Sequence, residues 1–247
     1  MCPVLSPESM RGLGQAIPPL AGQTVSCVGI RLEAEPDSYC RAVAPFVSEA
    51  ERQRAARYFH AIDAARHLLG RFVVRSVLAR VLGRGWIAEE LAQEARGKPF
   101  LPGCEIDFSI SHSGSWVWTA FCREAAVGID VEEVRRLDDL DDLVGALHPA
   151  ESASIREWPK DAHAAFFRCW TRKEAVLKAV GEGLLRAPDS FQVRTDAVPG
   201  NWLKEIWRGR SNEWTTRDEA VPGDPFSQEA LALHSPSVQE ASGGLVL

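Results

Sequence analysis

The sequence lacks the features that mark zinc proteins, disulfide-rich secreted domains and membrane proteins. It contains six cysteines, but no two of them form a CxxC pair, which excludes the usual zinc spacings and does not resemble a disulfide framework. No run approaches the roughly 20 apolar residues needed to span a bilayer. Residues 1–22 are interrupted by proline and glycine and have no apolar core region, so we expect neither a signal peptide nor a membrane anchor. The expectation is a cytoplasmic protein with free thiols.

The charged residues, 25% of the chain, are an ordinary share but are unevenly distributed. The net charge of -6 argues against general nucleic-acid binding. Eight arginines and a single acid, Asp63, lie between Arg52 and Arg84, whereas seven acids and two arginines lie between Asp130 and Asp142. A basic region in one part of the chain and acidic ligands in another suit an anionic substrate that is held with a metal ion.

The 247 residues, 45% of them hydrophobic, suffice for one large domain or two of ordinary size. The periodicity predicts helices over 49–60, 66–83 and 162–181, and another in the acidic stretch after 133; the two long ones end in glycines. Strands are predicted over 105–111, 116–121 and 126–133, with weaker signals at 189–195, around Trp207 and Trp214, and at 230–233. Residues 1–22 and 235–247 are expected to be a loose lead-in and a tail. The similar order of elements in the two halves predicts a pseudo-duplicated α+β protein.

Two short patterns bring acidic residues to one face of an element. AVGIDVEE, residues 126–133, alternates apolar with small or acidic residues and predicts a half-buried strand. Asp130 and Glu132 then share a face, where like charges repel. In the helix predicted over 162–181, Glu174 and Lys178 stand at i and i+4 and are neighbours. Taken alone, each pattern is more often a solvated charge or a surface ion pair than a site.

Taken together, these patterns favour a metal site. Asp130, Glu132 and Glu174 could converge where the strand faces the helix. A few carboxylates, with water and substrate phosphates, are what Mg²⁺ binds, and a cation would turn the repulsion into chelation. Mn²⁺ accepts the same ligands. Lys178, one turn beyond Glu174, would then reach a phosphate oxygen as a point charge.

Other residues fit an anionic ligand. Lys98 lies in the turn GKPFLPG, where a lone lysine is ordinarily just solvated. In ISHSGS, Ser111, His112 and Ser113 lie where a strand gives way to a turn; such a histidine is more often structural, but imidazole, hydroxyls and turn amides can also hold phosphate. We expect at least one of the clustered arginines to bind a phosphate through two N–H donors of its guanidinium group. The cluster consists of Arg52, Arg54, Arg57, Arg66, Arg71 and Arg75.

The segments GKP, FSISHS, GIDVE and WTRKEAVLKAVGEGL, in this order and with these gaps, resemble a 4′-phosphopantetheinyl transferase of the surfactin-synthetase-activating type. The resemblance runs from about Glu49 to Val193. It implies an α+β fold of two pseudo-symmetric halves, each a long helix packed on a small, largely antiparallel sheet. Residues 1–122 would supply the coenzyme A nucleotide and phosphate contacts. Residues 123–247 would supply the magnesium-binding acids and the catalytic helix.

The resemblance also implies an activity and its residues. Such an enzyme, a holo-[acyl-carrier-protein] synthase, transfers the 4′-phosphopantetheine arm of coenzyme A to a serine of an apo acyl or peptidyl carrier protein and releases 3′,5′-ADP. The metal ligands would be Asp130, Glu132 and Glu174, and the catalytic residues Glu174 and Lys178. Coenzyme A would be bound by residues that match the family motifs, namely Arg54, Arg66, Lys98, Ser111, His112 and Lys178.

Two positions depart from the family pattern, and one step of the mechanism stays open. Ser109 stands where many members have asparagine, and Glu51 stands where relatives often have a base, which affects the roles expected of Arg52 and Arg54. Glu174 is implied to remove the proton of the carrier serine, either directly or through a water on the metal.

The implied partners are acyl, peptidyl or aryl carrier domains of polyketide synthases, nonribosomal peptide synthetases or fatty acid synthases, with no nucleic acid and no membrane. A monomer is expected, because the interface between halves is internal. One alternative is a Mg²⁺-dependent phosphohydrolase acting on a nucleotide diphosphate compound, with water as nucleophile. Another is a non-catalytic nucleotide-binding protein. The phosphohydrolase accounts for the acids but not for the GKP, SHS and basic segments combined.

Overall fold

The computed structural model describes residues 25–123, 125–157, 162–181 and 186–195, together with three strands within residues 203–234. The elements up to residue 123 are β1 (Ser26–Arg31), α2 (Pro36–Val43), η2 (Ala44–Phe46), α3 (Glu49–Ala55), α4 (Ala61–Val81), β2 (Ala92–Gln93), β3 (Pro99–Phe100), β4 (Ile106–Ser113) and β5 (Trp116–Arg123). The later elements are β6 (Ala126–Glu133), α5 (Leu140–Gly145), α6 (Pro149–Arg156), α7 (Ala162–Val180), η5 (Pro188–Ser190), β7 (Leu203–Ile206), β8 (Glu213–Ala220) and β9 (Ser227–His234). The expected lead-in and tail, and Trp207, lie outside these described residues.

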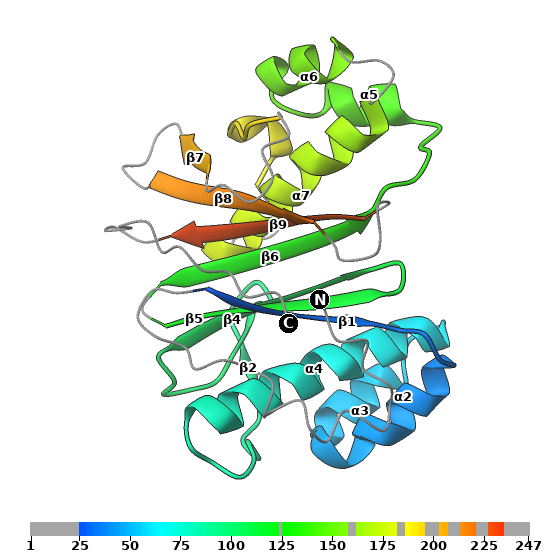
Figure 1. Cartoon of the computed structure of the whole chain (residues 1–247), viewed down its shortest axis with the longest axis vertical. Helices are drawn as coiled ribbons and strands as arrows, with labels where there is room; N and C mark the ends of the chain where they lie inside the picture. The colour runs from blue at the N-terminus through cyan, green and yellow to red at the C-terminus, as the bar shows by residue number, and fades with distance from the viewer. Residues whose placement is uncertain are drawn as a thin grey trace.

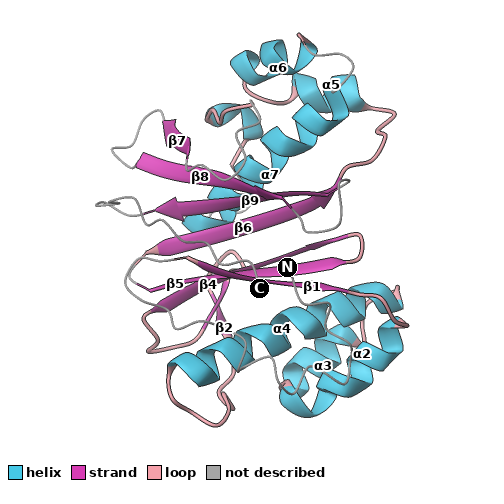
Figure 2. Cartoon of the chain, viewed as in Figure 1, coloured by secondary structure: helices cyan, strands magenta, loops and turns pink. Residues whose placement is uncertain are grey.

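Two antiparallel sheets form the centre of the molecule (Figure 1). The first has the strand order β1-β5-β4 and the second β6-β9-β8-β7. Helix α4 packs on the first sheet and α7 on the second. Figure 2 shows α2–α4 grouped at the end of the molecule next to the first sheet, and α5–α7 toward the opposite end. This confirms the predicted α+β class. The division of the chain between residues 122 and 123 stays a prediction; it falls in the last residues of β5.

The long helices agree with the apolar periodicity, while the first predicted helix is too long. The helix predicted over 49–60 ends at Ala55, because residues 56–60 are all exposed and leave no apolar stripe to bury. The next helix begins at Ala61 rather than at 66. Among the helices in the described part of the chain, none combines the length and hydropathy needed to cross a membrane.

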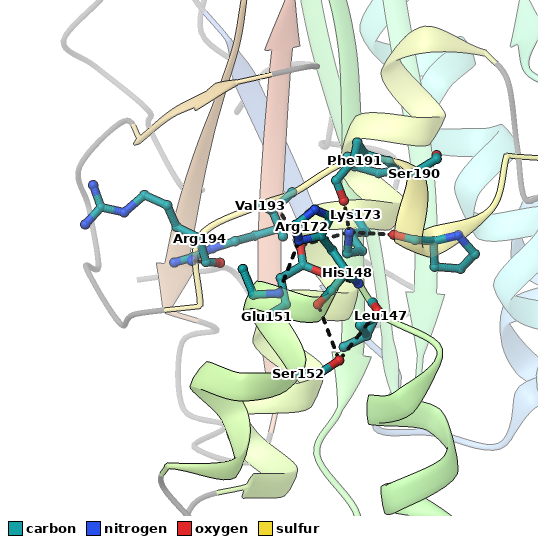
Figure 3. Close-up of polar contacts among 12 residues, drawn as sticks. Leu147, His148, Glu151, Ser152, Arg172, Lys173, Ser190, Phe191, Val193 and Arg194 are labelled. Atoms are coloured by element: carbon teal, nitrogen blue, oxygen red, sulfur yellow. Dashed lines mark hydrogen bonds and ion pairs between the residues drawn. The ribbon is translucent and has the colours of Figure 1, made fainter. Parts of the chain in front are cut away.

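The strand predicted over 189–195 is wrong. A 3-10 turn occupies Pro188–Ser190, and the chain then runs irregularly to Thr195. The backbone groups of this segment bond to buried side chains instead of to a neighbouring strand. The Lys173 ammonium donates to the carbonyls of Pro188 (2.7 Å) and Phe191 (2.5 Å). The Val193 N–H donates to the Glu151 carboxylate (2.7 Å). Figure 3 shows these contacts at the junction of α6, α7 and the segment.

Several elements were not predicted, among them β1 and α2. Strand β1 is buried along nearly its whole length, so its sequence, SCVGIR, does not alternate. Helix α2 packs against α4. By contrast, the prediction that residues 116–121 form a strand buried on both sides is confirmed by β5.

Strand β6 is buried on both faces, which corrects the prediction of a half-buried strand. Val127, Ile129 and Val131 pack in one cluster with Trp116 and Trp118 of the first sheet, so the apolar face does point to a core. The opposite face lies under α7. Its acidic residues therefore enter a region from which water is largely excluded.

The facing edges of the two sheets are joined by side chains. Strands β4 and β6 belong to different sheets, yet the polar residues of β4 accept hydrogen bonds from backbone N–H groups of β6 at a constant offset of 20 residues. The pairs are Val127 to Asp107, Ile129 to Ser109, Val131 to Ser111 and Glu133 to Ser113. The predicted alternation of β4 is confirmed, but its polar side forms the junction between the two sheets.

Candidate active site

Helix α7 presents two charged residues toward β6. Glu174 and Lys178 are partly exposed, while the residues beside them are buried. The Lys178 ammonium donates to Asp130 Oδ1 of β6 (2.6 Å) and to Ser111 Oγ of β4 (2.8 Å). The alternative of a surface ion pair within the helix is therefore wrong, because the charge partner of Lys178 comes from another element.

A glycine lets α7 approach β6 this closely. A Cβ atom at Gly128 would lie 1.9 Å from the Ala175 carbonyl oxygen and 2.5 Å from the Ala179 nitrogen. Only glycine fits where a helix backbone touches a strand. The absence of this one side chain brings Glu174 and Lys178 to the level of Asp130.

Asp130 is buried, with 3% of its surface exposed. Its Oδ1 accepts from Ser111 Oγ (2.8 Å) and from Lys178, while Oδ2 is buried without a hydrogen-bond partner. Burial raises the pKa of this carboxyl, and the Lys178 charge and the Ser111 hydroxyl oppose that rise.

Glu174 and Glu132 show the same combination of burial and mutual repulsion. Burial, and then the Asp130 charge, raise the pKa of Glu174 to about 7. Its Oε1 is buried without a hydrogen-bond partner. Burial, and then Asp130, also raise the pKa of Glu132, although its Oε2 accepts from Ser113 Oγ (2.9 Å). Each carboxyl lies where another positive charge would stabilise its ionised form.

The donor set fits a hard divalent cation. The unpartnered oxygens of Asp130 and Glu174 are carboxylate oxygens, and Mg²⁺ is usually bound through one or two carboxylates, with water and phosphate completing its shell. Within the described residues, no group of three or more His, Cys, Asp or Glu side chains could hold a metal ion as it stands. The three-carboxylate site predicted from the sequence therefore stays a prediction.

A cavity of about 310 Å³ lies beside these residues. Five of the predicted ligand-binding residues line it together, coming from α3, α4, α7 and the segments around β3 and β4: Arg54, Arg66, Lys98, His112 and Lys178. Arg71 and Arg96 add two further positive charges, and none of the lining residues is acidic. The wall thus carries a strong positive potential suited to a polyanion.

Several predicted ligand residues have protein partners. Lys98 donates to Asp107 (2.6 Å) and, at longer range, to two backbone carbonyls of the second half, so it ties the halves together. Arg66 bonds to Asp63 (2.7 Å) and to the Gly114 carbonyl, but its Nε is buried without a partner. Ser111 does not line the cavity; it positions Asp130 and Lys178.

His112 lies at the cavity wall beside two cations. Desolvation, and then the charges of Arg66 and Lys178, lower its pKa. The imidazole therefore stays neutral down to a lower pH than an isolated histidine does. The negative charge of a bound phosphate would raise its pKa again.

The sequence did not distinguish which clustered arginines reach the cavity. Arg52 bonds to the carbonyls of Ala44 and Val47, and Arg75 is buried in an ion pair with Glu51, so both support the fold. Tyr58, His67 and Arg96 line the cavity without having been predicted. One sequence signal was available: His67 and Arg71 stand at i and i+4 on the long helix, so they lie on the same helix face.

Comparisons with known proteins agree with this geometry. Residues 126–233 match the family model described as 4′-phosphopantetheinyl transferase superfamily, and residues 34–124 match the one described as 4′-phosphopantetheinyl transferase, N-terminal.

Curated relatives extend the match. The 4′-phosphopantetheinyl transferase Sfp of Bacillus subtilis (strain 168) is 34% identical over 151 residues, which are 60% of this chain and 66% of the relative. The 4′-phosphopantetheinyl transferase HetI of Nostoc sp. is 33% identical over 171 residues, 67% of this chain and 72% of the relative. A phosphopantetheinyl transferase of Thraustochytrium sp. is 29% identical over 208 residues, 76% and 71% of the two chains. The matched region spans 66% of the length of the Bacillus subtilis relatives, just under two thirds.

Proposed function

Because this chain belongs to the 4′-phosphopantetheinyl transferase superfamily, we propose that it transfers the 4′-phosphopantetheine arm of coenzyme A to a serine hydroxyl of an apo carrier protein. The observation that carries this proposal is the juxtaposition of two features. One is the pair of buried carboxylate oxygens without a hydrogen-bond partner, Oδ2 of Asp130 and Oε1 of Glu174. The other is an adjoining cavity lined by arginine and lysine without acids, which suits the diphosphate and phosphomonoester of coenzyme A.

Asp130 and Glu174 would hold Mg²⁺, with Glu132 as the third ligand. The cation would supply a Lewis acid for the diphosphate and for the leaving 3′,5′-ADP. The fit rests on the unpartnered oxygens and on the raised pKa values of the three carboxyls. Mg²⁺ is the expected ion, and the same oxygen ligands accept Mn²⁺.

Lys178 would stabilise the charge that develops on the transferred phosphoryl group. Its ammonium already lies 2.6 Å from Asp130 and also lines the cavity, so it can exchange a carboxylate for a phosphate oxygen with a small side-chain movement. A preorganised positive charge in a partly buried site is worth far more than one in water.

Glu174 would take the proton of the carrier serine, which attacks the β-phosphorus of coenzyme A as 3′,5′-ADP departs. A general base works best when its pKa lies near the working pH. In the metal-free protein, burial together with Asp130 raises the pKa of Glu174 to about 7; a cation held by the same carboxylate would lower that pKa. Ser111 orients the site by its hydrogen bonds with Asp130 and Lys178.

The nucleotide part of coenzyme A would occupy the cavity, in contact with Arg54, Arg66 and His112. Lys98 would contribute mainly through its charge, because its ammonium is engaged by Asp107. We propose acyl, peptidyl or aryl carrier domains as the acceptors, a monomeric protein and a cytoplasmic location.

The test uses purified apo carriers of several synthase types, coenzyme A and Mg²⁺, with carrier mass as the readout. The wild type should add one phosphopantetheine arm, and Asp130→Ala and Glu174→Ala should abolish transfer while circular dichroism stays unchanged. Glu133→Ala is the matched control, because strand alternation turns this exposed acid away from Asp130. Wild-type turnover in either site variant would remove the metal role. Rapid release of 3′,5′-ADP without any carrier would identify a hydrolase instead.

A further inference from the structure

Two serines of β4 each hold one of the acids that β6 brings to the site. Ser111 Oγ donates to Asp130 Oδ1 (2.8 Å), and Ser113 Oγ donates to Glu132 Oε2 (2.9 Å). Both pairs are 19 residues apart in the sequence, because the serines of β4 and the acids of β6 alternate in step. The serines belong to one sheet and the acids to the other, so the orientation of both carboxylates depends on the contact between the sheets.

The backbone of β6 decides how each hydroxyl group is used. The Val131 N–H donates to Ser111 Oγ (3.3 Å), and the Glu133 N–H donates to Ser113 Oγ (3.1 Å). A serine hydroxyl has a single proton, and because the N–H already supplies the proton of its own hydrogen bond, the hydroxyl proton is left for the carboxylate. Hydrogen bonds to an ionised carboxylate are roughly twice as strong as those between neutral groups. Each serine therefore fixes a carboxylate together with the strand that carries it.

Ser109, two residues earlier on β4, makes only one of these two contacts. Its Oγ accepts from the Ile129 N–H (3.1 Å), as the later serines do from their own partners. The residue 19 positions after it is Gly128, which has no side chain to accept the hydroxyl proton. Support of the sheet junction and orientation of a carboxylate are thus separate roles within one strand.

Glu132 depends on its serine more than Asp130 does. Asp130 Oδ1 accepts from both Ser111 and Lys178. Within the described part of the chain, the Glu132 carboxylate accepts a hydrogen bond from Ser113 alone. A glutamate side chain loses rotamer freedom when it is fixed for a ligand. A hydrogen bond that already exists in the free protein reduces that cost of binding.

We propose that Ser113 is a positioning residue for the divalent cation: it holds one oxygen of Glu132 and leaves the other for the metal. The proposal rests on the proposed function, in which Glu132 is the third metal ligand. Hydrogen-bond partners of metal-binding side chains typically contribute about 10- to 100-fold to metal affinity. The sequence suggested a phosphate contact for Ser113, whereas its hydroxyl donates to a carboxylate.

The experiment measures Mn²⁺ binding to the full chain without nucleotide or carrier, from the electron paramagnetic resonance signal of the unbound ion. Ser113→Ala should weaken Mn²⁺ binding about tenfold or more, and Ser113→Thr, which keeps the hydroxyl, should bind nearly as the wild type does. Ser109→Ala is the matched control. It removes an acceptor of a β6 N–H from the same strand but no contact with a carboxylate, so its Mn²⁺ affinity should equal that of the wild type.

A double-mutant cycle separates positioning from a general loss of structure. If Ser113 acts through the Glu132 carboxylate, Ser113→Ala should not weaken Mn²⁺ binding further in a Glu132→Ala background. A disturbance of the whole site would weaken binding by the same factor in both backgrounds. Circular dichroism of each variant checks that it is folded.

Three results would overturn the positioning role: wild-type Mn²⁺ affinity in Ser113→Ala, an equal loss in the Glu132→Ala background, or an equal loss in Ser109→Ala. The expected pattern of Mn²⁺ affinities, combined with failure to modify any carrier, would refute the transferase and support the role of Ser113. Normal transfer to carriers, combined with Mn²⁺ binding that does not depend on Ser113, would refute the positioning role alone.

Discussion

The close approach of α7 to β6 depends on the missing side chain at Gly128, and a single methyl group there should disrupt it. In Gly128→Ala, the added Cβ would lie 1.9 Å from the Ala175 carbonyl oxygen, about 1.5 Å short of the 3.4 Å at which ordinary contact begins. The atoms that it meets belong to the helix backbone and cannot rotate away. The helix itself would have to move by more than about 1 Å.

The cost should exceed that of ordinary overpacking. Extra methylene groups in a packed core typically cost about 1–3 kcal/mol, and here no side-chain rotation can relieve the clash. We therefore expect the free energy of unfolding to fall by about 3 kcal/mol or more, measured by urea denaturation. A displacement of about 1 Å between Glu174 and Asp130 should also lower turnover about a hundredfold, even where the protein is folded.

Gly85→Ala is the matched control, because a Cβ at Gly85 meets no atom within 4 Å. It should leave both stability and turnover close to those of the wild type. Wild-type stability and activity in Gly128→Ala would contradict the inference that glycine sets the spacing between strand and helix. A loss of stability with full activity would show that the spacing matters for the fold alone.

Three further predictions follow from the buried polar groups. In protein stripped of metal by a chelator, Glu174→Gln should raise the free energy of unfolding at pH 8 by about 1–2 kcal/mol, after allowing for solvent screening of a half-buried group. At pH 4 the substitution should have little effect. The pKa of the Glu174 carboxyl rises from 4.5 to about 7 on folding, so the free energy of unfolding of the wild type falls as the pH climbs through that interval and the group ionises. A pH-independent difference would refute the assignment. Asp107→Asn should cost about 2–4 kcal/mol in thermal or urea unfolding, because it removes the charge partner of the Lys98 ammonium; an unchanged melting temperature would contradict that ion pair. Ser109→Ala should cost about 1–2 kcal/mol by leaving the Ile129 N–H without its acceptor, and transfer activity should persist at temperatures where the variant is folded.

Local sequence was sufficient for the elements that repeat a simple pattern. The apolar periodicity of residues 162–181 predicted α7 almost to its ends, and the alternation of residues 105–111 predicted β4. Prediction from local sequence failed where backbone groups bond to side chains that are distant in the sequence. The segment after Pro188 is such a case, because Lys173 and Glu151 take the bonds that a neighbouring strand would otherwise supply.

The sequence by itself determined the family, the α+β class and the identity of the charged residues, because ordered motifs and their spacing are properties of the chain. Only the tertiary structure decided how those residues are used. It paired Lys178 with Asp130 rather than with Glu174, assigned Arg75 to Glu51, and left Arg71 facing the cavity. Whether a charge is neutralised or held ready for a ligand depends on burial and on partners distant in sequence, and those are fixed only when the sheets and helices pack together.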